Sequence, residues 1–168
     1  MAFSVIAAMD SKRGVGKGGV IPWRLKGDLE HFREITVGQG KNAVIMGRAT
    51  WLSLPEKFRP LSGRVNVVLS RGPLELPAGV LHAGSLPEAL ELFAGQPIEE
   101  IFIIGGGQVY AEAIGHPACK KIYLTEVDGE FGCDTFFPEI PAMFQRASTL
   151  EPMSEGEFKY RFVTYEKA

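Results

Sequence analysis

The chain has 168 residues, 45% hydrophobic and 23% charged, with 18 Lys and Arg against 20 Asp and Glu and a net charge of -2 at pH 7. This length is typical of one domain, and the composition excludes a chain that is disordered throughout. A face that binds nucleic acid broadly usually makes a domain strongly basic, so the balanced charge disfavours nucleic acid as a partner. A small anionic ligand, which needs only a few local cations, stays open.

The cysteines, histidines and N-terminus restrict the class of protein further. Cys119 and Cys133 lie far apart and form no CxxC pair, which favours a reducing compartment over a disulfide scaffold. The three histidines lack metal-ligand spacing, so we predict no metal site. The apolar start, Met1–Met9, lacks the features of a signal peptide, and no run reaches the roughly 18 apolar residues that cross a bilayer. We therefore expect one soluble, cytoplasmic domain over residues 1–168, with no membrane partner.

The first half of the chain alternates strand and helix patterns. An apolar run predicts a strand at Phe3–Met9, and the glycines of Gly14–Pro22 predict a long mobile loop of the kind that often carries function. Apolar residues three apart predict a helix over Asp28–Ile35. Short apolar runs then predict strands at Asn42–Met46 and Val65–Ser70, covered on both faces of a sheet.

The second half continues the alternation. Ser85 and Glu88 form a capping box that opens a helix, and Gly95 can end it. The remaining predicted elements are strands at Ile101–Ile104 and Ile122–Val127, a helix at Gly107–Ile114, and an alternating strand at Phe158–Thr164. The last strand is half-buried or at an edge, and antiparallel. The order predicts an α/β protein with a mostly parallel sheet and helices on both faces.

One glycine motif resembles a nucleotide-binding loop but does not complete it. Gly14–Gly19 looks like part of a P-loop, yet position 11 is Ser, and Gly18 follows Lys17 where a hydroxyl residue would hold Mg²⁺. A flexible glycine loop is the favoured interpretation, and a lid over a ligand is the alternative.

Three predicted strands end in residues that suit an anionic ligand. They are followed by Gly105–Gly107, by Gly47–Thr50 and by Ser70–Arg71. Any one of these is also compatible with an ordinary turn. Together they favour a dinucleotide, because ligands of open α/β sheets bind beyond the carboxyl ends of the strands. Arg48 and Arg71 favour an additional phosphate, and therefore NADP over NAD.

Asp28 and two arginines are candidates for binding a second ligand. Asp28 begins a helix and shares a face with Phe32, so it is either an N-cap or first-turn carboxylate of that helix or a carboxylate that binds a flat nitrogen heterocycle. Arg59 and Arg64 flank Pro60–Gly63 and form either a basic loop or a clamp for a ligand carboxylate.

Five stretches carry a resemblance that runs from end to end of the chain. They are Ile21–Asp28, Val44–Trp51, Ser62–Ser70, Ile104–Tyr110 and Asp134–Pro138. In this order and spacing they are together highly specific, and the chain resembles dihydrofolate reductase. The resemblance implies reduction of dihydrofolate to tetrahydrofolate with NADPH, antifolate inhibitors as further ligands, and a fold of eight strands, mostly parallel, with an antiparallel C-terminal strand and four helices.

The resemblance also implies roles for individual residues. Asp28 would bind the pterin N3 and 2-amino group, Thr125 would reach that group through water, and Arg64 would pair with the glutamate α-carboxylate, with Arg33 and Arg59 nearby. The ring pockets would be lined by Ile6, Ala8, Phe32 and Leu54. Residues assigned to the cofactor are Ala8, Val15, Gly16, Gly19, Val20, Gly47, Arg48, Ala49, Thr50, Leu69, Ser70, Arg71, Ile104, Gly105, Gly106, Gly107, Gln108, Val109 and Tyr110.

Within those assignments, Gly105–Gly106 matches a cis peptide of the family, and Gly14–Trp23 matches a loop that closes over nicotinamide. Ala49 and Gln108 replace polar or basic residues of other members, so Arg48 and Arg71 carry most of the expected preference for NADPH.

The implied catalytic residues are Asp28, Trp23 and Tyr110. The expected chemistry is hydride transfer to pterin C6 with a proton delivered to N5. Because no other acid is placed near N5, Asp28 would act indirectly, fixing the ring and raising the basicity of N5 while water supplies the proton.

Two rival functions remain at this point. A related reductase of a ribosylated pyrimidine would usually lack the segment with Trp23 and Asp28, and a non-catalytic nucleotide-binding module would need no acid in its pocket. Loss of NADPH absorbance on addition of dihydrofolate distinguishes all three. A monomer is the expected state, since nothing in the sequence demands an apolar interface.

Overall fold

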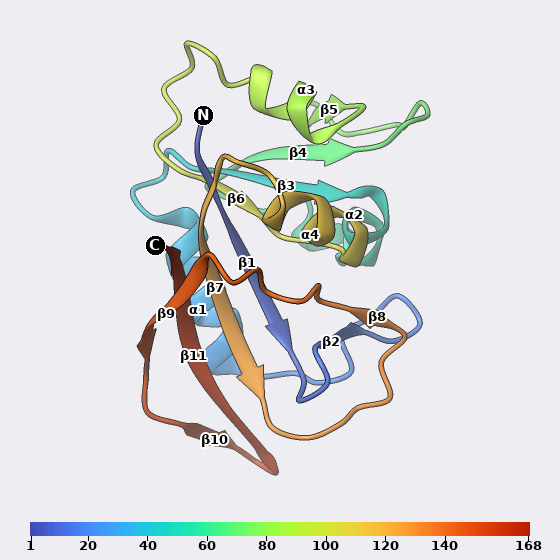
Figure 1. Ribbon diagram of the computed structural model, residues 1–168. Coiled ribbons are helices and arrows are strands. Elements are labelled where there is room, and N and C mark those ends of the chain that lie inside the picture. The colour runs from blue at the N-terminus through green and yellow to red at the C-terminus, as the bar shows by residue number, and fades with distance from the viewer.

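The computed structural model describes residues 1–168 and is built around one large sheet (Figure 1). Its strands are β1 (Phe3–Met9), β3 (Ala43–Gly47), β4 (Val65–Leu69), β5 (Leu81–Ala83), β6 (Ile101–Ile103), β7 (Cys119–Val127), β9 (Phe144–Thr149), β10 (Met153–Glu155) and β11 (Phe158–Lys167). The order is β10-β11-β7-β1-β6-β3-β4-β5, and β9 pairs with β11. Because β9 and β10 pair with different stretches of β11, the sheet is eight strands wide.

The direction of the strands confirms the predicted fold class. All pairs from β7 across to β5 are parallel, whereas β11 runs antiparallel to β7, β9 and β10. The predicted strands at Asn42–Met46, Val65–Ser70 and Ile101–Ile104 are each present with ends shifted by a residue. The strand predicted at Ile122–Val127 starts earlier, at Cys119.

Helices cover both faces of the sheet, as predicted. They are α1 (Lys26–Val37), α2 (Arg48–Ser53), α3 (Leu86–Glu91) and α4 (Gly107–Ile114), with a short 3-10 turn, η1 (Glu56–Phe58). In Figure 1, α4 lies in front of the sheet and α1 behind it. No helix combines the length and apolar character that crossing a membrane requires.

The two faces follow from the alternation of side chains along each strand. In β3, Ile45 joins the cluster under α3 and α4, whereas Val44 and Met46 join the cluster that includes Trp51 of α2 and Phe32 of α1. All three strand residues are fully buried. This double burial explains why the central strands are nearly continuous apolar runs.

The helix after Ser85 shows the predicted cap with one difference. The Ser85 hydroxyl accepts a hydrogen bond from the Glu88 N–H at 3.3 Å, but the Glu88 carboxylate accepts from the N–H of Gly84 at 2.8 Å and not from that of Ser85. The helix ends at Glu91, and turns lead from there to Gly95, which has a positive φ of 75°.

The loop predicted at Gly14–Pro22 contains a short strand, so that prediction was wrong for its first residues. Strand β2 (Gly14–Gly16) pairs antiparallel with β8 (Thr135–Phe136) in a second, two-stranded sheet. The buried Asp10 carboxylate holds this region to the end of β1. It accepts hydrogen bonds from the N–H groups of Lys12, Gly14 and Phe131 at 2.7–3.1 Å, and these bonds keep the pKa of Asp10 below its usual value despite burial.

We expect Gly14→Ala to lower the free energy of unfolding by about 2 kcal/mol or more, because overpacking forces its neighbours to move. A Cβ at Gly14 would lie 2.5 Å from Cys133 Cβ and 2.8 Å from Asp10 Oδ2. Urea unfolding provides the measurement. Gly72→Ala is the control, since no atom lies within 4 Å of the added carbon there. Equal stability of the two variants would contradict the assigned packing.

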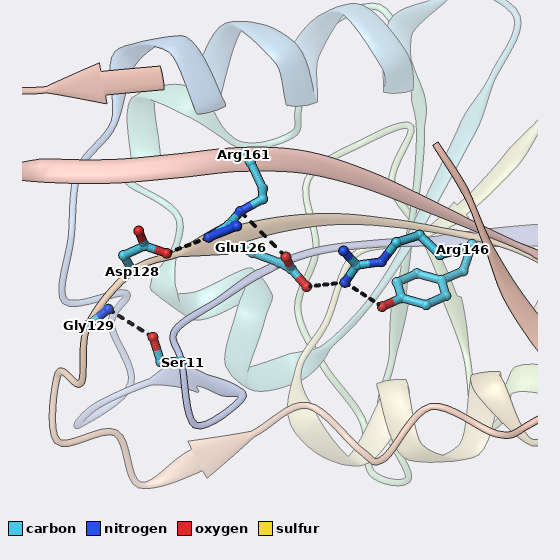
Figure 2. Close-up of polar contacts among 7 residues, drawn as sticks. Ser11, Glu126, Asp128, Gly129, Arg146 and Arg161 are labelled. Carbon is cyan, nitrogen blue, oxygen red and sulfur yellow. Dashed lines mark hydrogen bonds and ion pairs between the residues drawn. The ribbon is translucent and has the colours of Figure 1, made fainter. Parts of the chain in front are cut away.

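Ion pairs join the antiparallel strands on the face opposite α1 (Figure 2). Glu126 of β7 faces Arg161 of β11 in register, and its carboxylate also accepts from Arg146 of β9 at 3.1 Å. Arg161 donates in turn to Asp128 at 2.7 Å. Since neighbouring residues of a strand point to opposite faces, Glu126 fixes the register in which Thr125 points towards α1.

Candidate active site

The three strand ends singled out in the sequence are neighbours in the structure. In the order β6-β3-β4 the parallel strands end at Ile103, Gly47 and Leu69; α2 begins directly after β3, and α4 begins at Gly107, after three further residues. Ile104 lies between β6 and the glycines, and its N–H donates to the Ile45 carbonyl at 3.0 Å. The predicted meeting of these strand ends at one edge of the sheet is therefore confirmed.

A cluster of glycines brings the backbones of β3 and β6 close together. The Gly47 N–H donates to the Gly105 carbonyl at 2.8 Å, and the Gly105–Gly106 peptide is cis. A Cβ at Gly105 would lie 3.2 Å from the Thr50 hydroxyl oxygen and 3.3 Å from that of Tyr110. The residue also has φ +132°, which side-chain-bearing residues rarely adopt. Only glycine fits this position without displacing its neighbours.

Some of the other predicted cofactor residues lie next to this glycine cluster. Val109 of α4 is half-buried against Gly47, and a Cβ at Gly107 would meet Thr135 at 2.7 Å. Gln108 and Ala49 are exposed at the starts of α4 and α2. The backbone N–H groups at these two helix starts are available to an anion.

Two cations stand free beyond the strand ends. Arg48 at the start of α2 and Arg71 after β4 are both exposed, and neither belongs to an ion pair of the chain. Ser70 beside Arg71 donates its hydroxyl to the Gly72 carbonyl at 2.9 Å. These arginines differ from Arg59, Arg146 and Arg161, each of which faces a carboxylate.

Asp28 lies in the first turn of α1 and points into the molecule. Its Oδ1 accepts a hydrogen bond from the Thr125 hydroxyl of β7 at 2.6 Å. Asp28 is not the N-cap of the helix, because α1 begins at Lys26 and its first N–H groups bond elsewhere, but it does lie in the first turn as the alternative interpretation expected. Thr125, which the resemblance assigns to the pterin 2-amino group through water, is thus in direct contact with the Asp28 carboxylate.

The surroundings of Asp28 favour its protonated form. Burial raises the pKa of the carboxyl group, the Thr125 hydroxyl lowers it in part, and the negative charge of Glu155 raises it further. An acid of raised pKa, with one hydrogen-bond partner, suits a site that binds a ring able to carry a proton.

Apolar side chains lie beside this carboxylate. Ile6 is buried in the cluster beneath α1 and α2, against which Phe32 and Leu54 pack as half-buried groups. Ala8, two residues after Ile6 in β1, is half-buried. Trp23 is only 6% exposed and packs on Phe131, with ring centroids 5.1 Å apart. Trp23, one of the predicted catalytic residues, is thus a buried aromatic group of the core.

Tyr110 links two strands at the centre of the site. Its hydroxyl lies 2.9 Å from the Ile6 carbonyl and 2.8 Å from that of Ile104, so it donates its proton to the backbone between β1 and β6. Burial, and then the charge of Asp28, raises the pKa of Tyr110. The phenol is therefore neutral, and its position beside Gly105 is held by the backbone.

Of Arg33, Arg59 and Arg64, only Arg59 pairs with a carboxylate, and Arg64 is the more buried of the other two. It donates to the Thr36 hydroxyl and to the Ser62 carbonyl, both at 2.9 Å, and its guanidinium lies 6.0 Å from the Phe32 ring centroid. Burial and the nearby Arg33 lower the pKa of Arg64 to about 10, which leaves it charged at neutral pH. Arg59 instead pairs with Glu56 at 3.6 Å.

The glycine loop reaches the site from β2. Val15 and Gly16 belong to β2, whereas Gly19 and Val20 lie in an exposed turn closed by backbone hydrogen bonds between Lys17 and Val20. The Asp134 carboxylate accepts the Gly18 N–H at 2.9 Å and so ties this turn to the segment before β8.

Sequence reasoning missed Glu155, whose charge acts on Asp28. It lies in β10, and its carboxylate contacts residues 128 and 129 positions away in the chain. A glutamate in an unassigned polar segment carries no local signal of this role.

Comparison with known proteins assigns the chain to a family. A family model described as "Dihydrofolate reductase" matches residues 2–167. Dihydrofolate reductases of Heliothis virescens and Drosophila melanogaster are 39% and 37% identical over 98% and 99% of this chain, and 96% and 98% of their own lengths. The bifunctional dihydrofolate reductase-thymidylate synthase of Glycine max is 43% identical over 97% of the chain, which spans only 33% of that protein. On the family match and the two insect relatives, the chain belongs to the dihydrofolate reductase family.

Proposed function

We propose that the chain reduces dihydrofolate to tetrahydrofolate with NADPH, the reaction that its family catalyses. The observation that carries the proposal is the inward-pointing Asp28 carboxylate, bonded to Thr125 and placed on the face of the sheet that also holds Ile6, Phe32 and Leu54. A carboxylate beside apolar groups binds a flat heterocycle by paired N–H bonds and apolar contact together.

For the substrate, we assign Asp28 and Thr125 to the pterin end and Arg64 to the carboxylate end. Arg64 supports this assignment because it is half-buried and charged, and its protein partners are a hydroxyl and a carbonyl only. A guanidinium in such surroundings can donate two hydrogen bonds to a carboxylate in a bidentate pair. Arg33 beside it would add to the positive potential.

The residues at the strand ends fit NADPH. Gly105 and Gly47 let the strand ends pack closely against Thr50 and Val109, because a Cβ at either glycine would meet one of these side chains at 3.1–3.2 Å. Thr50, Ser70 and the free cations Arg48 and Arg71 would hold phosphate groups, and the loop Gly14–Trp23 would cover the nicotinamide end. When bound, NADPH supplies the hydride.

The chain's own residues would orient the ring and control its proton. Asp28 would hold the pterin through N3 and the 2-amino group and raise the basicity of N5, with water delivering the proton. Tyr110 keeps β1 and β6 in place through the carbonyls of Ile6 and Ile104. Ile6, Phe32 and Leu54 would exclude bulk water from the ring.

The test of the function is direct. Purified protein is mixed with NADPH and dihydrofolate, and the near-ultraviolet absorbance of NADPH is followed. We expect its loss on addition of dihydrofolate and inhibition by an antifolate. An absorbance that stays constant, with NADPH still bound, would instead support a nucleotide-binding module.

Arg71→Ala is expected to narrow the preference for NADPH over NADH by about tenfold, the worth of one charge-assisted contact to phosphate. The ratio of kcat/KM for the two cofactors is the measurement. Lys159→Ala, which removes an exposed cation from β11, is the control. An unchanged ratio in the Arg71 variant would assign the extra phosphate to other residues.

We also propose that the protein is a monomer working in a reducing compartment, the cytoplasm. Two free cysteines, one of them buried, support the reducing compartment. Sedimentation of the purified chain tests the monomer, and fractionation of source cells tests the compartment.

A further inference from the structure

The start of α1 is capped by a residue from the other end of the chain. Leu25 at the N-cap position provides no side-chain hydrogen bond. The N–H of Lys26 donates instead to Glu155 Oε2 at 2.7 Å, and the N–H of Gly27 donates to Glu155 Oε1 at 2.9 Å. Both carboxylate oxygens of Glu155 are thus used on the two residues that directly precede Asp28.

Close packing leaves this contact little freedom. The Tyr160 hydroxyl donates to Glu155 Oε1 at 3.3 Å, and a Cβ at Gly27 would overlap that hydroxyl. Glu155 lies opposite Phe158, and Met153 opposite Tyr160, in the hairpin of β10 and β11. The hairpin therefore fixes both the position and the orientation of the first turn of α1. It thereby also fixes the direction of the Asp28 side chain.

The pKa of Glu155 is lowered, whereas the pKa of Asp28 is raised. The two N–H donors keep the pKa of Glu155 below its usual value, so Glu155 is ionised wherever Asp28 titrates. Its charge adds to burial in raising the pKa of Asp28, against the Thr125 hydroxyl. The other titratable groups near Asp28 are Tyr110 and Tyr160, whose pKa values are raised so that both stay neutral. Lys26 lies on the Glu155 side and offsets part of that charge.

We propose that Glu155 is a positioning residue of the active site: it orients the helix turn that carries Asp28 and places a fixed negative charge beside that carboxylate. A role of Glu155 in catalysis rests on the proposed function. The contact of Glu155 with the start of α1 does not depend on that function. Glu155 touches no reacting atom. It acts through its hydrogen bonds to the backbone of α1 and through its negative charge, which lies near the Asp28 carboxylate.

The experiment compares Glu155→Gln, Glu155→Ala and the control Glu157→Gln, which removes an exposed charge from the same hairpin. Carbon-13 NMR of labelled aspartate follows the titration of Asp28 in the protein without ligand. We expect the midpoint to move to lower pH by a few tenths of a unit in both Glu155 variants, since a negative charge is removed. The control should titrate like the parent protein.

A second measurement separates orientation from charge. The Gln variant keeps an oxygen that accepts one N–H, whereas the Ala variant keeps none. We therefore expect KM for dihydrofolate to rise several-fold in Glu155→Ala and less in Glu155→Gln, with a graded effect that a general loss of stability would not produce. Thermal unfolding of each variant identifies such a loss.

An Asp28 midpoint in Glu155→Gln equal to that of the parent would overturn the inference. If neither parent nor variants reduce dihydrofolate, the proposed function fails, and the titration still decides whether Glu155 acts on Asp28.

Discussion

Asp28→Asn is expected to lower the rate of the hydride step by about 10²-fold or more at neutral pH, within the range of acid–base contributions. The amide keeps the shape of the side chain and can still accept from Thr125, but it cannot pair with a cationic ring or raise the basicity of N5. Single-turnover kinetics with NADPH and dihydrofolate isolate the step from product release. Glu30→Gln, a charge removed from the exposed side of the same helix, should leave the rate unchanged. A near-parental rate for Asp28→Asn would remove Asp28 from the mechanism.

The same variant should be more stable than the parent protein when no ligand is bound. Because the folded protein raises the pKa of Asp28, it binds this proton more tightly than the unfolded chain does. The stabilisation from that proton is complete below the ordinary pKa of an aspartate and is lost as pH rises through the raised value. At neutral pH the ionised carboxylate therefore destabilises the fold, and Asp28→Asn should unfold at a higher temperature. The difference should shrink in acid.

Arg64→Ala is expected to raise KM for dihydrofolate by about 10- to 100-fold with a much smaller change in the hydride step. The estimate corresponds to a charge-assisted contact of about 1.5–3 kcal/mol. Steady-state kinetics give KM, and single-turnover kinetics give the step. Lys41→Ala, which removes an exposed cation that belongs to no predicted site, is the control.

A truncated substrate sharpens this test. A dihydropterin without the glutamate tail has no carboxylate for Arg64, so the Arg64→Ala variant and the parent protein should reduce it equally well. A similar loss with both substrates would mean that Arg64 supports the fold through Thr36 and Phe32, and that the carboxylate binds elsewhere.

The central strands could be predicted because local burial dictates their composition. Ala43–Gly47 and Ile101–Ile103 are covered on both faces, and only uninterrupted apolar runs meet that demand. The glycines that follow these strands could also be recognised, because two backbones can approach each other closely only where the residues lack a side chain. Both features are determined by the local environment of a short segment, so the residue types of that segment are enough to predict them.

Elements held by distant pairing were not predictable in this way. In β9, five of six residues are exposed, and the strand exists because it pairs with β11. The β2–β8 pair joins Gly14 to Phe136, and neither segment alternates in polarity. Hydrogen bonds to a partner far along the chain decide such strands, and propensity does not.

The residues of the candidate site likewise divide into those that local sequence could predict and those that depend on distant contacts. Asp28 was a candidate from its place at the start of an amphipathic helix, and it lies in the first turn, although the N-cap position belongs to Leu25. Thr125, 97 residues away, was implied by the family resemblance alone, and Glu155 by nothing in the sequence. A side chain that reaches across the molecule leaves no trace in the spacing of its neighbours.

The capping of α1 from β10 has a consequence for synthesis. As the polypeptide leaves the ribosome, Asp28 emerges early, but the residue that fixes its turn is made 127 positions later, and the hairpin needs Phe158 and Tyr160 as well. A nascent chain can therefore form the parallel strands while its pterin pocket is still unformed. Ligand capture by ribosome-bound intermediates should begin only once the final strand has been released.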